Sequence, residues 1–300
     1  MNRMMFRTAV TAALLAGTAL SSLAQPASPT LAKIAETGTI TLGHRESSIP
    51  FSYYDDKQQV VGYSHELMLK VVEAVKADLK KPGLAIKLVP VTSQNRIPLI
   101  VNGTVDIECG STTNNSERAR QVNFSTNIFV VGTRLMTKKD SGIKDFPDLS
   151  GKNVVVTAGT TSERLLRKYN EEKNAGMRII SAKDHGESFL TLETGRAVAF
   201  MMDDALLYGE KAKAKKPDEW VVVGKPMSEE AYACMLRKDD AGFKKIVDAA
   251  LTKAMTSGEA AKIYAKWFQA PIPPKGLNLA WPMSDDVQAL FKAPNDKPFE

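Results

Sequence analysis

A short polar segment that follows an apolar strand carries the residue types of an anion-binding site. The strand ends at Glu108 and Cys109, Gly110 follows, residues 111–116 are all small and polar, and Arg118 comes shortly after. Glycine lets another group approach the backbone closely, and Ser, Thr and Asn at a helix start leave N–H groups pointing outward. Outward N–H groups together with a guanidinium suit a planar carboxylate. A capped turn with a solvated arginine is the other interpretation, and the segment alone leaves both open.

Strands and helices are predicted to alternate on both sides of this segment. The chain predicts strands at residues 38–43, 84–91, 104–110, 152–159, 177–182, 196–204, 219–224 and 231–240. It predicts helices at 63–81, 93–103 (with Ser93 as the expected cap), 160–172, 184–195, 204–215, 241–256 and 258–268, and a proline-rich tail from Pro271. Such alternation is typical of an α/β protein with mostly parallel sheets, which bind ligands at the carboxyl ends of their strands.

Two long extended segments are predicted to join two α/β lobes. They cover residues 129–139 and 221–238. Two crossings of this kind form a hinge with a cleft beneath it, whereas the alternative of one domain would need a sheet of about nine strands. We therefore predict that residues 25–136 and 226–300 form the first lobe and residues 137–225 the second.

Polar side chains follow the predicted strands of both lobes. Those of the first lobe are Arg45, Ser93, Arg96, Ser111, Thr113 and Arg118. Those of the second lobe are Thr160, Thr161, Ser162, His185 and Asp203. Three arginines, several hydroxyls and one carboxylate drawn from different loops favour a ligand cleft between the lobes over a set of unrelated surface positions.

The first 24 residues predict a cleaved signal peptide. Arg3 and Arg7 precede an apolar run at residues 9–20, and small residues at Ser22 and Ala24 suit a signal peptidase. The run is too short to anchor the chain in a bilayer. We expect cleavage near Ala24 and export to the periplasm. An amphipathic helix is the alternative, and it accounts poorly for the position at the N-terminus.

Charge and histidine spacing exclude several classes of partner. The 300 residues carry a formal charge of +6, which falls to +4 without Arg3 and Arg7. Residues 211–216 form the only dense basic run, and it lacks interleaved aromatic residues, so no nucleic-acid partner is predicted. The three histidines lie far apart in the sequence, so neither a metal nor another cofactor is predicted.

Five motifs together resemble a known family. They are GHRESSIPFSYYD, SQNRIPLIVNGTVDIECGSTTNNSER, VVTAGTTSE, ISAKDHGESF and AVAFMMDDALL. In order and spacing they resemble the periplasmic glutamate/aspartate-binding proteins of solute-binding protein family 3, from about Ile34 to the C-terminus. The resemblance implies a two-lobed periplasmic-binding-protein fold of type II, a monomer, L-glutamate or L-aspartate as ligand, and an inner-membrane ABC permease as partner.

The resemblance also implies a role for each of nine residues. It places the ligand α-carboxylate on Arg118, Ser111 and Thr113, and the α-ammonium on Asp203. It places the ligand side-chain carboxylate on Arg45, Ser93 and Arg96, with Thr161 and His185 closing from the second lobe. Asp204 would point away from the cleft if the strand continues.

The number of arginines favours an acidic amino acid for a separate reason. An amino-acid backbone uses one arginine and one aspartate, which leaves Arg45 and Arg96. A neutral ligand side chain would leave both guanidiniums poorly paired in a closed cleft, at a cost of ~3–5 kcal/mol for a stranded buried charge. A surface position for Arg45, or an ion pair with Glu46, is the alternative that the sequence leaves open.

Two other functions share this fold. A same-fold enzyme would need a general acid or base in the cleft, for which only His185 and Glu108 are candidates. His185, at a predicted helix start, is better placed to donate to a carboxylate, so we predict no enzymatic activity. A receptor that reports the ligand to a membrane sensor would use the same cleft, and the sequence does not separate this role from transport.

The two cysteines raise the question of a disulfide in an exported protein. In the two-lobed topology, the returning strand at 231–238 would lie antiparallel to the strand at 104–110, which brings Cys109 and Cys234 together. We therefore expect a Cys109–Cys234 disulfide, with two buried free thiols as the alternative.

Overall fold

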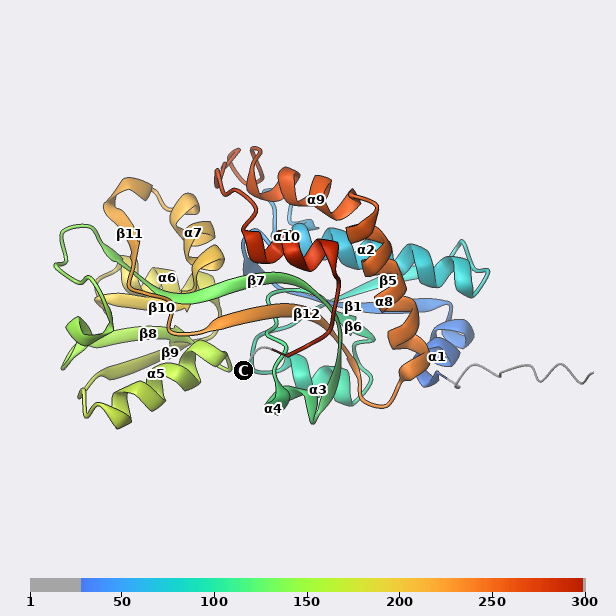
Figure 1. Cartoon of the computed structure of the whole chain (residues 1–300), viewed down its shortest axis with the longest axis horizontal. Coiled ribbons are helices and arrows are strands. Elements are labelled where there is room, and N and C mark those ends of the chain that lie inside the picture. The colour runs from blue at the N-terminus through green and yellow to red at the C-terminus, as the bar shows by residue number, and fades with distance from the viewer. Residues whose placement is uncertain (1–27, 299–300) are drawn as a thin grey trace, which may run out of the picture.

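Two α/β lobes are joined by two long strands in the computed structural model, which describes residues 28–298 (Figure 1). These strands are β7 (Val122–Lys138) and β12 (Glu229–Arg237), which pair antiparallel over the length of β12. They correspond to the two predicted crossings, and the two-lobed α/β fold is confirmed. The predicted signal peptide lies outside the described residues.

The first lobe is built on the sheet order β5–β1–β6–β12–β7. Strand β1 (Thr39–His44) pairs parallel with β5 (Ala85–Pro90) and with the two-residue β6 (Ile107–Glu108), and β12 pairs antiparallel with β6. The helices of this lobe are α1 (Pro29–Thr37), α2 (Tyr63–Asp78), α3 (Arg96–Val101), α4 (Ser116–Ala119), α8 (Ala241–Thr256), α9 (Glu259–Phe268) and α10 (Asp285–Lys292).

The helices cover the sheet with the apolar face that their sequences predict. In α2 the residues Leu67, Val71 and Val75 repeat at helical spacing and are fully buried, with Met68 and Val72 beside them. Helix α2 packs against α8 and α9, and α8 packs against β7. Among residues 28–298, no helix is both long and apolar enough to cross a bilayer.

The second lobe continues the sheet from β7. Its parallel strands are β10 (Ala199–Asp203), β8 (Asn153–Thr157) and β9 (Arg178–Ala182), and β11 (Trp220–Val223) pairs antiparallel with β7. Its helices are α5 (Thr161–Glu172), α6 (His185–Glu193) and α7 (Asp204–Lys213), with 3₁₀ turns at Phe146–Leu149 and Pro217–Glu219. Because β7 belongs to both lobes, their strands form one nine-stranded sheet, in which β11 pairs with β7 outside the main strand order, and yet Figure 1 shows two separate bodies.

Several elements were absent from the sequence prediction. A small sheet of β2 (Ser47–Ser48), β3 (Ser52–Tyr54) and β4 (Val60–Val61) lies where no strand is predicted, and α1 is not predicted either. The proline-rich tail, for which no helix is predicted, contains α10. That helix is capped by Ser284 and buries Val287, Leu290 and Phe291. Ser93 does not cap α3, because that helix begins after Asn95.

The C-terminal tail connects the two lobes outside the strands. It is held to the first lobe where α10 packs on β7 and α8, and where the Asn127 N–H donates to the Asn295 carbonyl at 2.8 Å. Earlier in the tail, the rings of Trp281 and Tyr208 (on α7) pack edge to face, with ring centroids 4.8 Å apart. One side chain of the tail therefore contacts the second lobe directly.

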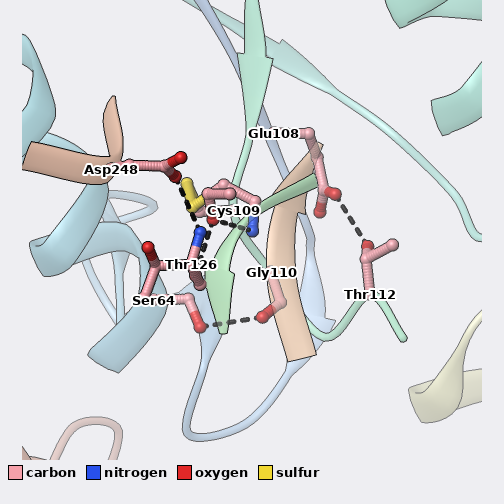
Figure 2. The surroundings of a disulfide bond; sticks show 9 residues. Ser64, Glu108, Cys109, Gly110, Thr112, Thr126 and Asp248 are labelled. Atoms are coloured by element: carbon pink, nitrogen blue, oxygen red, sulfur yellow. Dashed lines mark hydrogen bonds between the residues drawn. A yellow bond between two sulfur atoms is a disulfide. The ribbon is translucent and has the colours of Figure 1, made fainter. Parts of the chain in front are cut away.

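A disulfide joins Cys109 to Cys234, as predicted (Figure 2). The antiparallel pairing of β6 with β12 places Met235 opposite Glu108, so the two cysteines are neighbours with Cα atoms 4.3 Å apart. The alternative of two free thiols is wrong. Next to Cys109, the Gly110 carbonyl accepts a hydrogen bond from the Ser64 hydroxyl at 2.7 Å.

Candidate functional site

Arg45 and Arg96 lie buried where the first lobe faces the second. Their exposed fractions are 1% and 2%, so the surface position left open for Arg45 is wrong. Arg96 Nη1 donates to the Ser111 carbonyl at 3.1 Å and to Thr112 Oγ1 at 2.6 Å, and Arg45 Nη1 donates to Ser111 Oγ at 3.4 Å. Neither Nε–H has an acceptor among the described residues. The pair can therefore still donate to an anion.

Burial weakens the protonation of both guanidiniums. It lowers the pKa of Arg45 to about 10, with a further decrease from the charge of Arg96, and it also lowers the pKa of Arg96. With a pKa of about 10, Arg45 stays charged at neutral pH. The charge of Glu108 opposes the shift in both arginines, so this carboxylate acts as their common counter-charge.

Glu108 lies fully buried behind the two arginines. Thr112 Oγ1 donates to Glu108 Oε2 at 2.7 Å and accepts from Arg96, so the hydroxyl links the carboxylate to the guanidinium. A Cβ atom at Gly110 would lie 2.5 Å from Glu108 Oε1 and 2.9 Å from Arg45 Cγ. The glycine singled out in the sequence is thus needed for close packing around a buried charge.

Arg118 stands at the rim of the same space, in the four-residue helix α4. The helix begins at Ser116 and is capped by Asn115. Arg118 Nη1 donates to the Thr113 carbonyl at 3.1 Å, and Nη2 donates across the cleft to the Gly159 carbonyl at 3.3 Å. Burial lowers its pKa to about 9, and the charge of Arg96 adds to this. A cavity of about 460 Å³ opens beside Arg118 and Thr161.

The second lobe contributes side chains from the first turns of two helices. Thr160 caps α5, and Thr161 then donates from Oγ1 to Glu230 Oε2 at 2.7 Å. Asp184 caps α6, whose first residue is His185. The Nδ1 atom of His185 lies 2.9 Å from Thr157 Oγ1, and Nε2 has no partner among the described residues.

His185 is held in its neutral form. Burial lowers its pKa well below the usual range, and the positive charges of Arg45 and Arg96 lower it further. Which of the two atoms donates in the His185–Thr157 bond depends on the ring tautomer. A neutral ring offers the ligand a hydrogen-bonding nitrogen, Nε2, and no charge.

Asp203 ends β10 at the back of the cleft and is the carboxylate that the sequence selected. Its Oδ1 accepts from Thr133 Oγ1 at 3.2 Å and from Ser162 Oγ at 3.5 Å, and its Oδ2 accepts from the Tyr232 hydroxyl. Burial, together with the charge of Glu230, raises the pKa of Asp203 to about 8. The neighbouring Asp204 instead accepts from the Gly132 N–H at 3.3 Å, in the hinge, and so points away as expected.

Sequence reasoning missed two side chains of this site, Glu230 and Tyr232. Both lie on β12, whereas the strand that the sequence predicts begins at Ala231 and excludes Glu230. The segment after β6 runs beside β12, with the Asn114 N–H donating to the Ala231 carbonyl at 2.8 Å. Side chains alternate between the two faces of a strand, so Glu230 and Tyr232 lie on the same face of β12 as Cys234. Because the position of Cys234 is predicted, this alternation is the signal that could identify them.

Ser93 is the remaining predicted site residue. It lies buried in the loop before α3, and its Oγ has no partner among the described residues. All nine predicted residues are therefore largely buried, and contacts connect most of them within one region.

The two lobes touch across the cleft. Ser47 Oγ donates to Asp184 Oδ1 at 3.2 Å and accepts from the Gly186 N–H at 3.3 Å. At the end of β8, Gly159 has φ +77°, and a Cβ atom there would lie 2.8 Å from the backbone of Gln94. The conformation is therefore a closed one, in which the cleft excludes bulk water from its buried charges.

The arrangement can bind an anion that also carries a cationic group. Three buried guanidiniums donate, while Asp203 and Glu230 can receive a cation. Among residues 28–298, no group of three or more His, Cys, Asp and Glu side chains is arranged to hold a metal.

Relatives of known name match nearly the whole chain. The glutamate/aspartate import solute-binding protein of Salmonella typhimurium is 67% identical over 91% of each chain. The L-glutamate/L-aspartate-binding protein of Pseudomonas aeruginosa is 64% identical over 98% of this chain and 96% of its own. Among solved structures, a mutant of ArgBP from T. maritima matches with a TM-score of 0.71 at 26% identity, over 80% of this chain and 99% of that one.

A family model also matches the chain, and it agrees with the fold, the charged cleft and the relatives described above. The model for bacterial extracellular solute-binding proteins, family 3, covers residues 40–270. The chain belongs to this family of bacterial extracellular solute-binding proteins.

Proposed function

We propose that this protein binds L-glutamate or L-aspartate outside the cytoplasm as the solute-binding component of an ABC import system. The observation that carries the proposal is the pair of buried guanidiniums, Arg45 and Arg96, in addition to Arg118. One arginine and Asp203 suffice for the backbone of an amino acid. The second and third arginines suit a second carboxylate, and close relatives are named for glutamate and aspartate.

The proposed roles follow from the position of each group. Arg118 binds the α-carboxylate at the rim, and Asp203 receives the α-ammonium, which favours its ionised form. Arg45 and Arg96 bind the side-chain carboxylate through their two Nε–H groups, which lack an acceptor in the part of the chain that the structure describes. Ser93 Oγ and His185 Nε2, which are also buried and without partners among residues 28–298, are two neutral polar atoms that remain for further hydrogen bonds with the ligand.

Calorimetric titration with L-glutamate, L-aspartate and L-glutamine tests the assignment. Replacing Arg45 or Arg96 by Gln should cost L-glutamate about 2–5 kcal/mol of binding free energy, the scale for truncating a buried charge pair. L-Glutamine should lose little, because it has no side-chain charge to pair.

The matched control is Arg118→Gln, which should weaken all three ligands by a similar factor. If Arg118→Gln discriminates between glutamate and glutamine while the Arg45 and Arg96 variants do not, the roles are reversed. If the unaltered protein binds none of the three amino acids, the function itself is wrong.

The finer parts of the function are proposals of the same kind. We propose that the protein is a periplasmic monomer, cleaved near Ala24, that delivers its ligand to an inner-membrane permease. Mass spectrometry of the exported protein tests the cleavage site. A start before Ser22 or well beyond Ala27 would contradict it. Incubation with the same amino acids, followed by product analysis, separates a receptor from a same-fold enzyme.

A further inference from the structure

Glu230 connects the two lobes through a single carboxylate oxygen. Its Oε2 accepts from Thr113 Oγ1 of the first lobe and, at 2.7 Å, from Thr161 Oγ1 of the second. Its Oε1 accepts from Ser228 Oγ at 3.2 Å. The side chain is 4% exposed, and it approaches no cation within ion-pair distance among the described residues. A buried carboxylate held by three hydroxyls calls for a reason beyond charge pairing.

The consequence concerns the hydroxyl protons of the two threonines. A hydroxyl has one proton to donate and two lone pairs to accept with. Because Thr113 and Thr161 both direct their proton to Glu230, each can offer a ligand only its lone pairs. Lone pairs suit an ammonium group and repel a carboxylate. The Thr113 hydroxyl is therefore unsuited to the α-carboxylate role that family resemblance implies for this residue.

We propose that Glu230 is a positioning residue that fixes the Thr113 and Thr161 hydroxyls as hydrogen-bond acceptors and so makes the cleft selective for a ligand with an α-ammonium group. The inference rests on the proposed function, because it concerns the α-substituent of the same ligand. Asp203 supplies the negative charge opposite the α-ammonium group. The Thr113 and Thr161 hydroxyls supply two hydrogen-bond acceptors, and an ammonium group has enough N–H donors to bond to all three at once.

The test compares L-glutamate with L-2-hydroxyglutarate, which keeps both carboxylates and replaces the ammonium by one hydroxyl. The measured quantity is the ratio of the two dissociation constants. In Glu230→Met, which fills the space without an acceptor, this ratio should fall by about tenfold or more. Glu230→Gln keeps an acceptor oxygen in place, so the ratio of the two dissociation constants should fall less than in Glu230→Met. This conservative variant also serves as the test if Glu230→Met folds poorly.

A double-mutant cycle shows whether Glu230 acts through the two hydroxyls. In a Thr113→Val/Thr161→Val background, adding Glu230→Met should change the ratio less than twofold. An equal loss for both ligands in Glu230→Met would mean a purely structural role and overturn the inference. Tighter binding of both would mean that Glu230 competes with a ligand carboxylate, which overturns it as well. Failure of the unaltered protein to bind L-glutamate would instead refute the proposed function.

Discussion

At the scale of single residues, the cleft holds an unusual density of buried charge. Arg45, Arg96 and Arg118 face Glu108, Asp203 and Glu230, all less than a tenth exposed. Burial disfavours the charged form of each of the three arginines and of Asp203, and the surrounding backbone carbonyls and hydroxyls offset only part of this cost. Buried charged side chains with shifted pKa values cluster where proteins bind ligands or catalyse reactions. Here they provide the specificity of the cleft and lower the stability of the folded protein.

The raised pKa of Asp203 predicts a pH-dependent stability. The folded-state pKa is about 8, above the ordinary value of 3.8, so the folded protein holds this proton more tightly than the unfolded chain. The stabilisation is complete below about pH 4 and is lost as the pH rises towards 8. In ligand-free protein, Asp203→Asn should therefore gain in melting temperature relative to the unaltered protein between pH 5 and pH 8.5.

A matched control is available at Asp148, whose pKa is lowered by the backbone N–H groups of Lys144 and Asp145. Because the Asp148 carboxyl is already ionised between pH 5 and pH 8.5, Asp148→Asn should shift the melting temperature by the same amount at both ends of this range. A pH-independent effect of Asp203→Asn would contradict the buried-proton argument.

Residue types predicted much of this site, because arginines and hydroxyls after strands are few and recognisable. Glu230 could not be selected in the same way. Its role depends on the two hydroxyls that meet it in space, from Thr113 and Thr161, which lie far from it in sequence. Glu108 was considered only as a possible acid or base, because its neighbours across the fold were not known.

At the scale of elements, the ends of strands and the starts of helices form the contact between the lobes. Gly159, between β8 and α5, lies against Gln94, in the loop before α3. Its positive φ and the 2.8 Å approach both require the absence of a side chain. The contact therefore exists only while the lobes are closed around this glycine.

Gly159→Ala should hold the lobes apart. We expect weaker binding of every ligand, mainly through faster dissociation, because the clash with Gln94 destabilises the closed state. Gly176→Ala is the control for backbone strain, since Gly176 has φ +64° but nothing within 4 Å of an added Cβ. Stopped-flow measurement of dissociation rates tests this. Equal effects of the two variants would show that strain, and not the contact, is responsible.

Long periodic elements could be predicted from the sequence, whereas short ones could not. Helices α2 and α8 show a full apolar stripe, and their bounds agree with the prediction within a few residues. Strands β2 and β4 have two residues each, too few to show any alternation. In the tail, prolines obscured the apolar spacing of α10, although Val287, Leu290 and Phe291 follow the helical pattern.

At the scale of the whole molecule, the contact between Trp281 and Tyr208 should favour the closed arrangement. An edge-to-face aromatic pair contributes about 0.5–1.5 kcal/mol. Trp281→Ala should therefore weaken L-glutamate and L-aspartate by the same factor, about 2- to 10-fold, since neither ring lies among the proposed ligand contacts. Tyr208→Ala should match it, and the double variant should add little. A change in the ratio of the two affinities would show that the tail acts on the site directly.

The disulfide should stabilise the fold through the long loop that it closes. Cys109 and Cys234 are 125 residues apart, and the cross-link restricts the unfolded chain, an effect of about 2–5 kcal/mol. Replacing both cysteines by serine should lower the melting temperature while leaving ligand selectivity unchanged. An unaltered melting temperature would contradict this expectation.

The same bond has a consequence for the integrity of the protein after cleavage by proteases. Every helix and strand of the second lobe lies between the two bonded cysteines in the sequence. A single peptide-bond cut anywhere in that lobe therefore produces two fragments that stay covalently linked. Nicked protein should migrate as one band on a gel without reductant and as two bands with it, so a protein that is exported among proteases can be cut in its second lobe without shedding either piece.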